Sequence, residues 1–421
     1  MINQYSIENF KIHKKSQLIQ LGGLTIFSGT NNSGKTSMIQ SLRALSMMNK
    51  TPFVLNYLPL EQIEELGDLK DTLNKSASRN EEINYSFVLE KEDDEECFVS
   101  LNFGSNLMLE NIGTITKEEA CLKEFVLRFL CRGKALEFKF ELQDKMVGRF
   151  ATYIMYQKIE DDYEKMEEVS FFKFIPLSLF DTLGDMRVQA KLRSWLDELM
   201  EIDDTKIRYL APYRMIPKNA KHIENDYLIS DGSNSAEILS IHGEMIIYNN
   251  EMTLRDAFNY WTREIMGAKF DAKFEQESYK LITREKGVDL GVHQLGFGNI
   301  QILPVILQVL LAKPGDLVII ENPEVHLHPR WKAKLAELFF DAVQHGVRIL
   351  IETQSIEIIT RIRLMVKQNP ALENLTKLYF FEKNGFESII RFIEIDKAGR
   401  LSAWPKDFLD EVVMEDNAKL I

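Results

Sequence analysis

A short pattern near the N-terminus has the residue types and spacing needed to bind a nucleoside triphosphate. Gly29 begins Gly-x-x-x-x-Gly-Lys-Thr, which continues through Gly34, Lys35 and Thr36. The two glycines allow close approach of the backbone to a ligand, and loop amides at a helix N-terminus direct donors at phosphate oxygens. Lys35 is expected to reach the β- and γ-phosphates, and the Thr36 hydroxyl to bind Mg²⁺. The remaining positions expected to cradle phosphate are Asn31, Asn32, Ser33 and Ser37.

A second acidic position is expected to complete the metal site. Residues 317–320 are Leu-Val-Ile-Ile, and Glu321 follows them directly. A wholly apolar run of this kind is typical of a strand buried on both faces of a parallel sheet. A buried strand that ends in an acid is common by itself, so its significance here comes from its combination with the phosphate loop. Glu321 is therefore the predicted metal-side carboxylate.

The elements around these residues indicate an α/β fold of the P-loop NTPase type with a mixed sheet. Residues 24–28 are rich in β-formers and residues 38–48 have helical spacing, which gives the strand, loop and helix that the motif requires. The last third of the chain alternates strand and helix patterns again, so one sheet is expected to form from both ends of the chain. The expected late elements are strands at 317–321, 347–351, 377–382 and 388–395 and helices at 330–344 and 356–367.

The middle of the chain is expected to form an antiparallel β lobe followed by a helical insertion. Alternating patterns at 83–89, 97–103 and 136–142 predict antiparallel strands. Residues 117–279 otherwise suggest a mostly helical region, with helices at 188–202 and 252–266. The predicted organisation is residues 1–116 and 286–421 as the two parts of an ATPase head, and residues 117–285 as the mainly helical insertion.

The composition of the 421 residues narrows the classes of protein. The hydrophobic fraction of 45% and charged fraction of 27% are ordinary for a soluble protein. No apolar run approaches the roughly 18–20 residues of a membrane helix, and no secretory signal is visible. Three cysteines without a CxxC pair fit a reducing cytoplasm. The net charge of −13 argues against broad coating of nucleic acid, although it leaves room for a local basic groove.

The sequence Glu-Asn-Pro-Glu-Val-His-Leu-His-Pro at 321–329 resembles the Walker B and D-loop segment of ABC-type AAA ATPases of the overcoming-lysogenization-defect (OLD) class. These ATPases include stand-alone relatives in prokaryotic antiphage and DNA-repair systems. The resemblance extends over nearly the whole chain. The other similar stretches are Leu295–Pro304 (signature motif), Ile351–Ser355 (switch strand), Tyr209–Arg214 and Trp404–Phe408.

The resemblance implies a homodimer or higher homo-oligomer in which two heads enclose two ATP molecules. The signature residues Gly296, Gly298 and Gln301 would then contact the nucleotide held by the opposite subunit. Two glycines at the start of a helix agree with such an anion site. A simple glycine turn before a buried helix explains the same residues without any ligand.

Three positions depart from the family pattern. Asn322 stands where a catalytic glutamate commonly follows the Walker B acid, Gln354 replaces the usual switch histidine, and Ile300 replaces a serine. Asn and Gln can orient a water molecule or a phosphate oxygen but cannot accept a proton. Glu324 is either the base instead or a structural acid that accepts from loop amides. We therefore expect slow hydrolysis, with Glu321, Asn322, Glu324 and Gln354 as the catalytic set.

The resemblance also bears on the use of the ATP. OLD nucleases carry a C-terminal nuclease domain with paired acids, whereas Asp396 here has no partner at that spacing. A separate effector protein, such as a nuclease, a toxin or a reverse transcriptase system, is therefore expected, and DNA contact is conceivable. The alternative is an ATP-dependent scaffold, without useful hydrolysis, that holds a toxin or nuclease partner inactive.

Overall fold

The computed structural model describes residues 2–15, 17–50, 57–63, 66–76, 82–91, 95–105, 120–147, 150–178, 180–203, 205–220, 222–223, 226–249 and 251–405. The chain forms two compact units. Unit 1 comprises Met1–Leu21, Thr36–Lys206 and Lys383–Ile389, and unit 2 comprises Gly22–Lys35, Ile207–Glu382 and Ile390–Ile421. Each unit therefore draws on residues from all three of the segments predicted from the sequence.

Unit 1 contains a ten-stranded antiparallel sheet in the order β11-β10-β9-β8-β7-β6-β5-β1-β2, with β4 paired to β7. Helix α1 (Lys35–Met47) belongs to this unit except for its first residue. It contacts the sheet through Ser41, whose Oγ lies 2.7 Å from the hydroxyl of Tyr5 on the first strand of the chain. The other helices are α2 (Leu69–Thr72) and α3 (Met186–Met200). The strands are β1 (Ile2–Glu8), β2 (Ile19–Gln20), β4 (Tyr57–Leu58), β5 (Ile83–Glu90), β6 (Glu96–Gly104), β7 (Ala120–Cys131), β8 (Lys134–Val147), β9 (Phe150–Ile159), β10 (Asp162–Phe172) and β11 (Ile175–Pro176).

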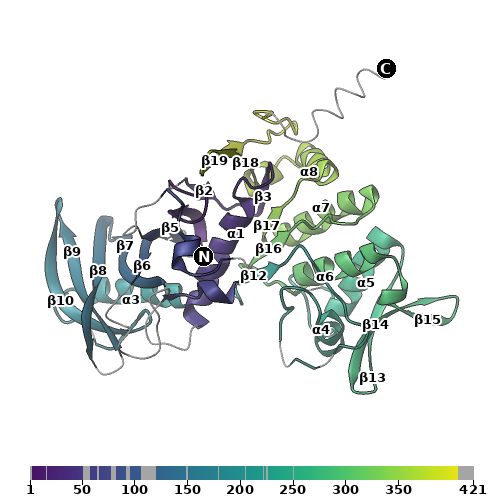
Figure 1. Cartoon of the computed structure of the whole chain (residues 1–421), viewed down its shortest axis with the longest axis horizontal. Helices are drawn as coiled ribbons and strands as arrows, with labels where there is room; N and C mark the ends of the chain where they lie inside the picture. The colour runs from purple at the N-terminus through teal and green to yellow at the C-terminus, as the bar shows by residue number, and fades with distance from the viewer. Residues whose placement is uncertain are drawn as a thin grey trace. The chain divides into compact units, whose positions relative to one another are not determined.

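The predicted antiparallel lobe is confirmed, and it is larger than the sequence suggested. The three predicted strands correspond to β5, β6 and β8. The expectation of a mostly helical region from residue 117 is wrong up to Phe172, because β7 to β10 form long paired strands there (Figure 1). Cross-strand aromatic packing stabilises these strands: the rings of Phe125 on β7 and Phe140 on β8 stack with centroids 4.4 Å apart. The predicted helices at 188–202 and 252–266 are present as α3 and as α5 (Leu254–Met266).

Unit 2 contains the sheet that carries the phosphate loop. Its strand order is β12-β16-β17-β3-β18-β19, and the pairings from β12 to β18 are parallel. The P-loop strand β3 (Leu24–Gly29) lies between β17 (Arg348–Glu352) and β18 (Thr376–Asn384). The other strands are β12 (Ile207–Leu210), β16 (Leu317–Glu321) and β19 (Glu387–Ile393). One sheet thus forms from both ends of the chain, and the predicted α/β fold of the P-loop type is confirmed.

Buried helices cover this sheet. Helix α6 (Phe297–Leu311) is buried continuously from Gln301 to Leu311. The predicted helices at 330–344 and 356–367 are α7 (Pro329–Gln344) and α8 (Ile356–Gln368), and both contribute side chains to the core of unit 2. The shorter helices are α4 (Ser235–His242), α5 (Leu254–Met266) and α9 (Leu372–Leu375). Within the described ranges no helix has the length and apolar character needed to cross a bilayer.

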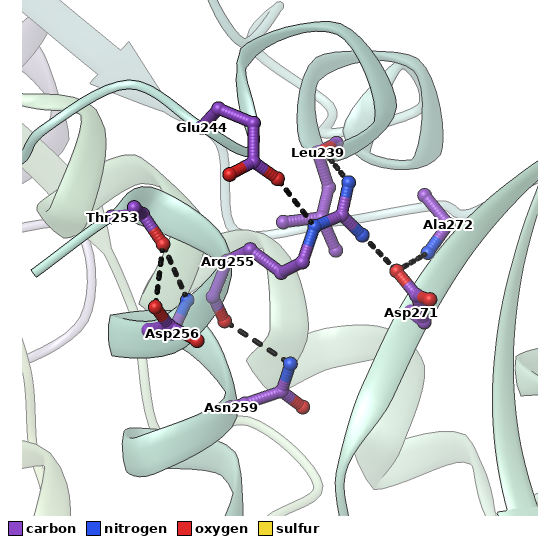
Figure 2. A network of polar contacts seen from close by, with 8 residues as sticks. All are labelled: Leu239, Glu244, Thr253, Arg255, Asp256, Asn259, Asp271 and Ala272. Atoms are coloured by element: carbon purple, nitrogen blue, oxygen red, sulfur yellow. Dashed lines mark hydrogen bonds and ion pairs between the residues drawn. The ribbon is translucent and has the colours of Figure 1, made fainter.

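A polar network joins α4 and α5 to a small three-stranded sheet in unit 2 (Figures 1 and 2). This sheet consists of β13 (Phe270–Glu275), β14 (Ser278–Glu285) and β15 (Val288–Gly291). Arg255 on α5 forms ion pairs with Asp271 on β13 and with Glu244. The helix itself begins at a cap in which Thr253 Oγ1 accepts from the backbone amide of Asp256 at 3.2 Å. The network therefore fixes the start of α5 against β13.

Candidate nucleotide-binding site

The phosphate loop starts where β3 passes very close to β18. Gly29 has φ of +136°, and a Cβ atom placed on it would lie 2.2 Å from the carbonyl oxygen of Phe381. Both the backbone angle and the close approach therefore require glycine at this position. Gly34, at the other end of the loop, has φ of +106°. The two glycines that the motif predicts thus occupy positions where a side chain would be strained.

The ammonium group of Lys35 is held inside the loop. Its Nζ donates to the carbonyl oxygens of Gly29 at 2.9 Å and Thr30 at 2.8 Å, and the residue is 4% exposed. Ser33 Oγ also donates to the Thr30 carbonyl, at 2.7 Å. Burial lowers the pKa of Lys35, and the nearby Glu352 carboxylate acts in the opposite direction. The loop therefore surrounds a cation that is positioned for an anionic ligand.

Two carboxylates end neighbouring strands beside the loop strand. Glu321 on β16 and Glu352 on β17 are in register, and they are 3% and 6% exposed. Glu321 Oε1 accepts from the Tyr209 hydroxyl at 2.8 Å, and Glu352 Oε1 lies 4.0 Å from Lys35 Nζ. Sequence reasoning identified Glu321 but not Glu352. The same signal was available, because Glu352 also follows an apolar run, Ile349-Leu350-Ile351.

The turn after β16 brings Glu324 to the switch segment. Asn322 adopts φ of +44°, and its backbone amide donates to the Glu352 carbonyl at 2.8 Å. Glu324 Oε1 accepts from the backbone amide of Gln354 at 3.0 Å. Burial raises the pKa of Glu324, and hydrogen bonds to its carboxylate partly oppose this effect. Glu324 Oε2 is buried and has no hydrogen-bond partner among the described residues.

Gln354, the residue at the switch position, contacts the phosphate loop directly. Its Nε2 donates to Asn31 Oδ1 at 3.0 Å and to the Gly29 carbonyl at 3.3 Å. Since its backbone amide binds Glu324, this one residue connects the loop with the turn after the Walker B strand. The structure thus brings together Gly29, Asn31, Lys35, Glu324 and Gln354.

Arg214 is an additional buried residue at this site. Its Nη2 donates to the backbone carbonyl of Glu321, and both Nη atoms lie 3.4 Å from the carbonyl oxygen of Asn322. Burial lowers the pKa of Arg214 to about 10, while Glu324, Tyr209 and Glu321 act to raise it. The sequence marked Tyr209–Arg214 as a landmark without giving it a role, because these contacts link residues more than a hundred positions apart.

The signature residues fall into two groups. Gly296 is the exposed N-cap of α6, and Gly298 is half-buried, with its ideal Cβ position 2.8 Å from the carbonyl oxygen of His326. Gln301 is only 1% exposed, and its Nε2 donates to the Arg214 carbonyl at 2.8 Å. This placement does not favour the predicted contact of Gln301 with a nucleotide on another subunit. Gly296 and Gly298 remain candidates.

The remaining predicted residues have simple placements. Asn31 and Asn32 are exposed at the tip of the loop, where Asn32 has φ of +59°. Thr36 is exposed and Ser37 half-buried, as the second and third residues of α1. Of the similar stretch at the C-terminus, residues 406–408 lie outside the described ranges.

The chain matches two family models. A family model described as "AAA ATPase domain" matches residues 1–359, and a second, described as "Protein of unknown function (DUF3696)", matches residues 373–416. No match was found among curated proteins.

Three solved structures of Smc heads show similarity to the chain at low sequence identity. An SmcHead bound to the C-winged helix domain of ScpA has 10% identity and a TM-score of 0.49, covering 94% of this chain and 98% of that chain. An SMC head domain from Thermotoga maritima has 12% identity and a TM-score of 0.44, with coverage of 94% and 99%. An Smc head domain with an extended coiled coil, bound to the C-terminal domain of ScpA and derived from Pyrococcus furiosus, has 10% identity and a TM-score of 0.42, with coverage of 100% and 99%.

Proposed function

Because the chain belongs to the AAA ATPase domain family, we propose that it is an ABC-type, Mg²⁺-dependent ATPase with slow turnover. We further propose that it dimerises around ATP and thereby controls a separate effector in prokaryotic antiphage defence or DNA repair. The observation that carries this proposal is the arrangement of Lys35, Glu324 and Gln354 around the phosphate loop.

The donors present fit a nucleotide with its metal ion. Lys35 offers a buried ammonium, which the carbonyl oxygens of Gly29 and Thr30 hold inside the loop. Thr36, by its place in the motif, would supply a hydroxyl, and Glu321 a carboxylate. The described residues contain no cluster of three or more His, Cys, Asp or Glu that could hold a metal ion. Mg²⁺ at nucleotide sites does not need one, because it takes ligands from one or two protein groups, phosphates and water.

Bound Mg²⁺ would neutralise part of the negative charge on the phosphates. The chain's own residues have three further tasks. Lys35 would leave the carbonyls of Gly29 and Thr30 and bind phosphate oxygens instead. Gln354 would orient a γ-phosphate oxygen or a water molecule through its amide, because it already lies against Asn31. Glu324 would accept the proton of the attacking water, a role suited to a buried carboxylate with a raised pKa.

Slow hydrolysis is proposed because two positions that commonly ionise carry amides. Asn322 and Gln354 can orient water but cannot take its proton. Of Asn322, Glu324 and Gln354, only Glu324 can accept a proton, and one of its oxygens is occupied by the Gln354 amide. Such an enzyme would hold ATP for long periods, and the bound state would persist as a signal to a partner.

A homodimer would use the exposed Gly296 and half-buried Gly298 of one subunit to contact the nucleotide of the other. Free amides at the start of α6 would donate to the γ-phosphate there. Dimer closure would then change the surface offered to the effector, which we propose to be a nuclease, a toxin or a reverse transcriptase system in the cytoplasm.

The alternative function is an ATP-dependent scaffold that holds such a partner inactive without useful turnover. Asn322 favours it, since a carboxylate at this position is what active heads of this type commonly use. Turnover stimulated by DNA would support the switch, whereas a constitutive, stoichiometric partner purified from the native host would support the scaffold.

The direct test compares full-length wild-type protein with Lys35→Ala, and with Lys218→Ala as an exposed lysine of the same unit. Calorimetric titration with an ATP analogue should show binding for wild type and Lys218→Ala and none for Lys35→Ala. Equal binding by all three proteins would refute the site. A steady-state rate of many per second, abolished by Asn322→Ala, would refute slow turnover with Glu324 as base.

A further inference from the structure

Arg214 lies where two parts of the nucleotide site meet. Through its guanidinium it binds the backbone carbonyls of Glu321 and Asn322, at the point where β16 ends and the chain turns with a positive φ. A planar group with several donors suits two adjacent carbonyls, and a single ammonium could not reproduce this geometry. The side chain of Arg214 therefore holds the turn that carries Glu324.

The backbone of Arg214 holds a different element. Its carbonyl oxygen accepts from Gln301 Nε2 at 2.8 Å, and Gln301 lies near the start of the signature helix α6. A second attachment lies one turn earlier, where Gly298 packs directly against the carbonyl of His326. Helix α6 thus contacts the segment after β16 directly at Gly298, and indirectly through Arg214 at Gln301.

Stability does not explain this choice of residues. Arg214 Nε and Gln301 Oε1 are both buried, and neither has a hydrogen-bond partner among the residues that the structure describes. A buried donor or acceptor without a partner is destabilising, and apolar side chains of similar shape would avoid that cost. We take these incompletely paired, buried side chains as a sign of a positioning role.

We propose that Arg214 is a positioning residue that, with Gln301, couples the turn after β16 to the start of α6. Nucleotide bound at Lys35 would shift the turn that carries Glu324. Arg214 would then pass this shift to Gly296 and Gly298, the residues that face a second subunit. This inference rests on the proposed function and adds a route by which a head senses its own nucleotide before it closes on a partner.

The test uses Gln301→Leu and Arg214→Lys in the full-length protein. Leucine removes the unpartnered Oε1 of Gln301 at nearly constant volume but also leaves the Arg214 carbonyl without its donor, so the thermal midpoint should change little. The matched control is Arg208→Lys, because Arg208 on β12 pairs with Asp316 at 3.0 Å, beside the opposite end of β16. Arg208→Lys should lower the thermal midpoint and leave coupling intact.

At protein concentrations at which the chain stays monomeric, hydrogen exchange of the peptide from Gly291 to Gln301 reports coupling within one subunit. In wild type and Arg208→Lys, an ATP analogue should slow exchange there about tenfold. In Gln301→Leu and Arg214→Lys this protection should disappear when each protein is saturated with the analogue, and the double variant should lose no more protection than either single variant.

The outcomes separate this inference from the proposed function. The coupling would be overturned if the analogue still protected this peptide in Gln301→Leu. It would also be overturned if the double variant lost more protection than either single variant. Neither result would affect the proposal that the protein binds ATP. A wild-type protein that binds no analogue would overturn both.

Discussion

Substitution of Gly29 by alanine tests the geometry on which the phosphate loop depends. A Cβ at this position would lie 2.2 Å from the Phe381 carbonyl oxygen and 2.7 Å from its amide nitrogen, whereas ordinary contacts begin at 3.4 Å. Two central strands must therefore separate by roughly 1 Å, which in a packed core costs about 1–3 kcal/mol. The backbone angle of +136° adds strain of about 1–3 kcal/mol for any residue with a side chain.

Gly287 provides the matched control. It lies in the turn between β14 and β15 of the same unit, has φ of +82°, and has nothing within 4 Å of its ideal Cβ position. Gly287→Ala therefore introduces strained backbone without a clash. Gly29→Ala should lower the free energy of unfolding by about 1–3 kcal/mol more than the control. At a urea dependence of about 3 kcal/mol per molar, the midpoint should fall by about 0.3–1 M more.

Urea unfolding should be followed by pulsed hydrogen exchange on peptides from β3 and β18, so that the signal comes from unit 2 alone. Gly29→Ala should also lose binding of the ATP analogue, and Gly287→Ala should retain it. If the two variants unfold at the same urea concentration, the close approach of β3 to β18 is not the reason for glycine at position 29.

Three further predictions concern single side chains. Burial raises the pKa of Glu324, so the folded state is destabilised as pH rises and this carboxyl group must ionise. Glu324→Gln should therefore be more stable than wild type at pH 7, and thermal melts should show that the gain vanishes near pH 4. Tyr209→Phe removes the 2.8 Å hydrogen bond to Glu321 and should cost about 0.5–1.5 kcal/mol; an unchanged thermal midpoint would show that this bond contributes nothing. Arg255→Ala breaks ion pairs to partly exposed carboxylates, so its cost should stay below about 1 kcal/mol and shrink in high salt, as denaturation at two ionic strengths would reveal.

The sequence was most informative where local patterns and burial agree. Runs such as Leu317–Ile320 are apolar throughout, and they are strands buried on both faces. The prediction of helices for residues 120–172 was wrong because the strands there carry many charged residues. In β10, for example, the first four residues are exposed, so no apolar run marks the strand. Strand β10 is stabilised by its antiparallel pairing with β9. The local sequence pattern does not reveal this pairing.

The same distinction applies to the site. The phosphate loop and Glu321 were predictable because each follows a buried strand with the motif residue at a fixed offset. The roles of Arg214, Tyr209 and Gln301 were not, because their hydrogen bonds join segments that only the tertiary structure brings together. The contact of Gln354 with Asn31 is an intermediate case, in which family resemblance supplied the location and the structure supplied the partner.

The order of strands in unit 2 has a consequence for synthesis on the ribosome. Strand β3 emerges early, but its neighbours β17 and β18 start at Arg348 and Thr376. At about 5–20 residues per second, the apolar segment from Leu24 to Phe27 must wait roughly 15–60 s for a pairing partner. A nascent chain released before residue 348 would lack both neighbours of that strand. ATP could then stabilise only a polypeptide whose translation had passed β17.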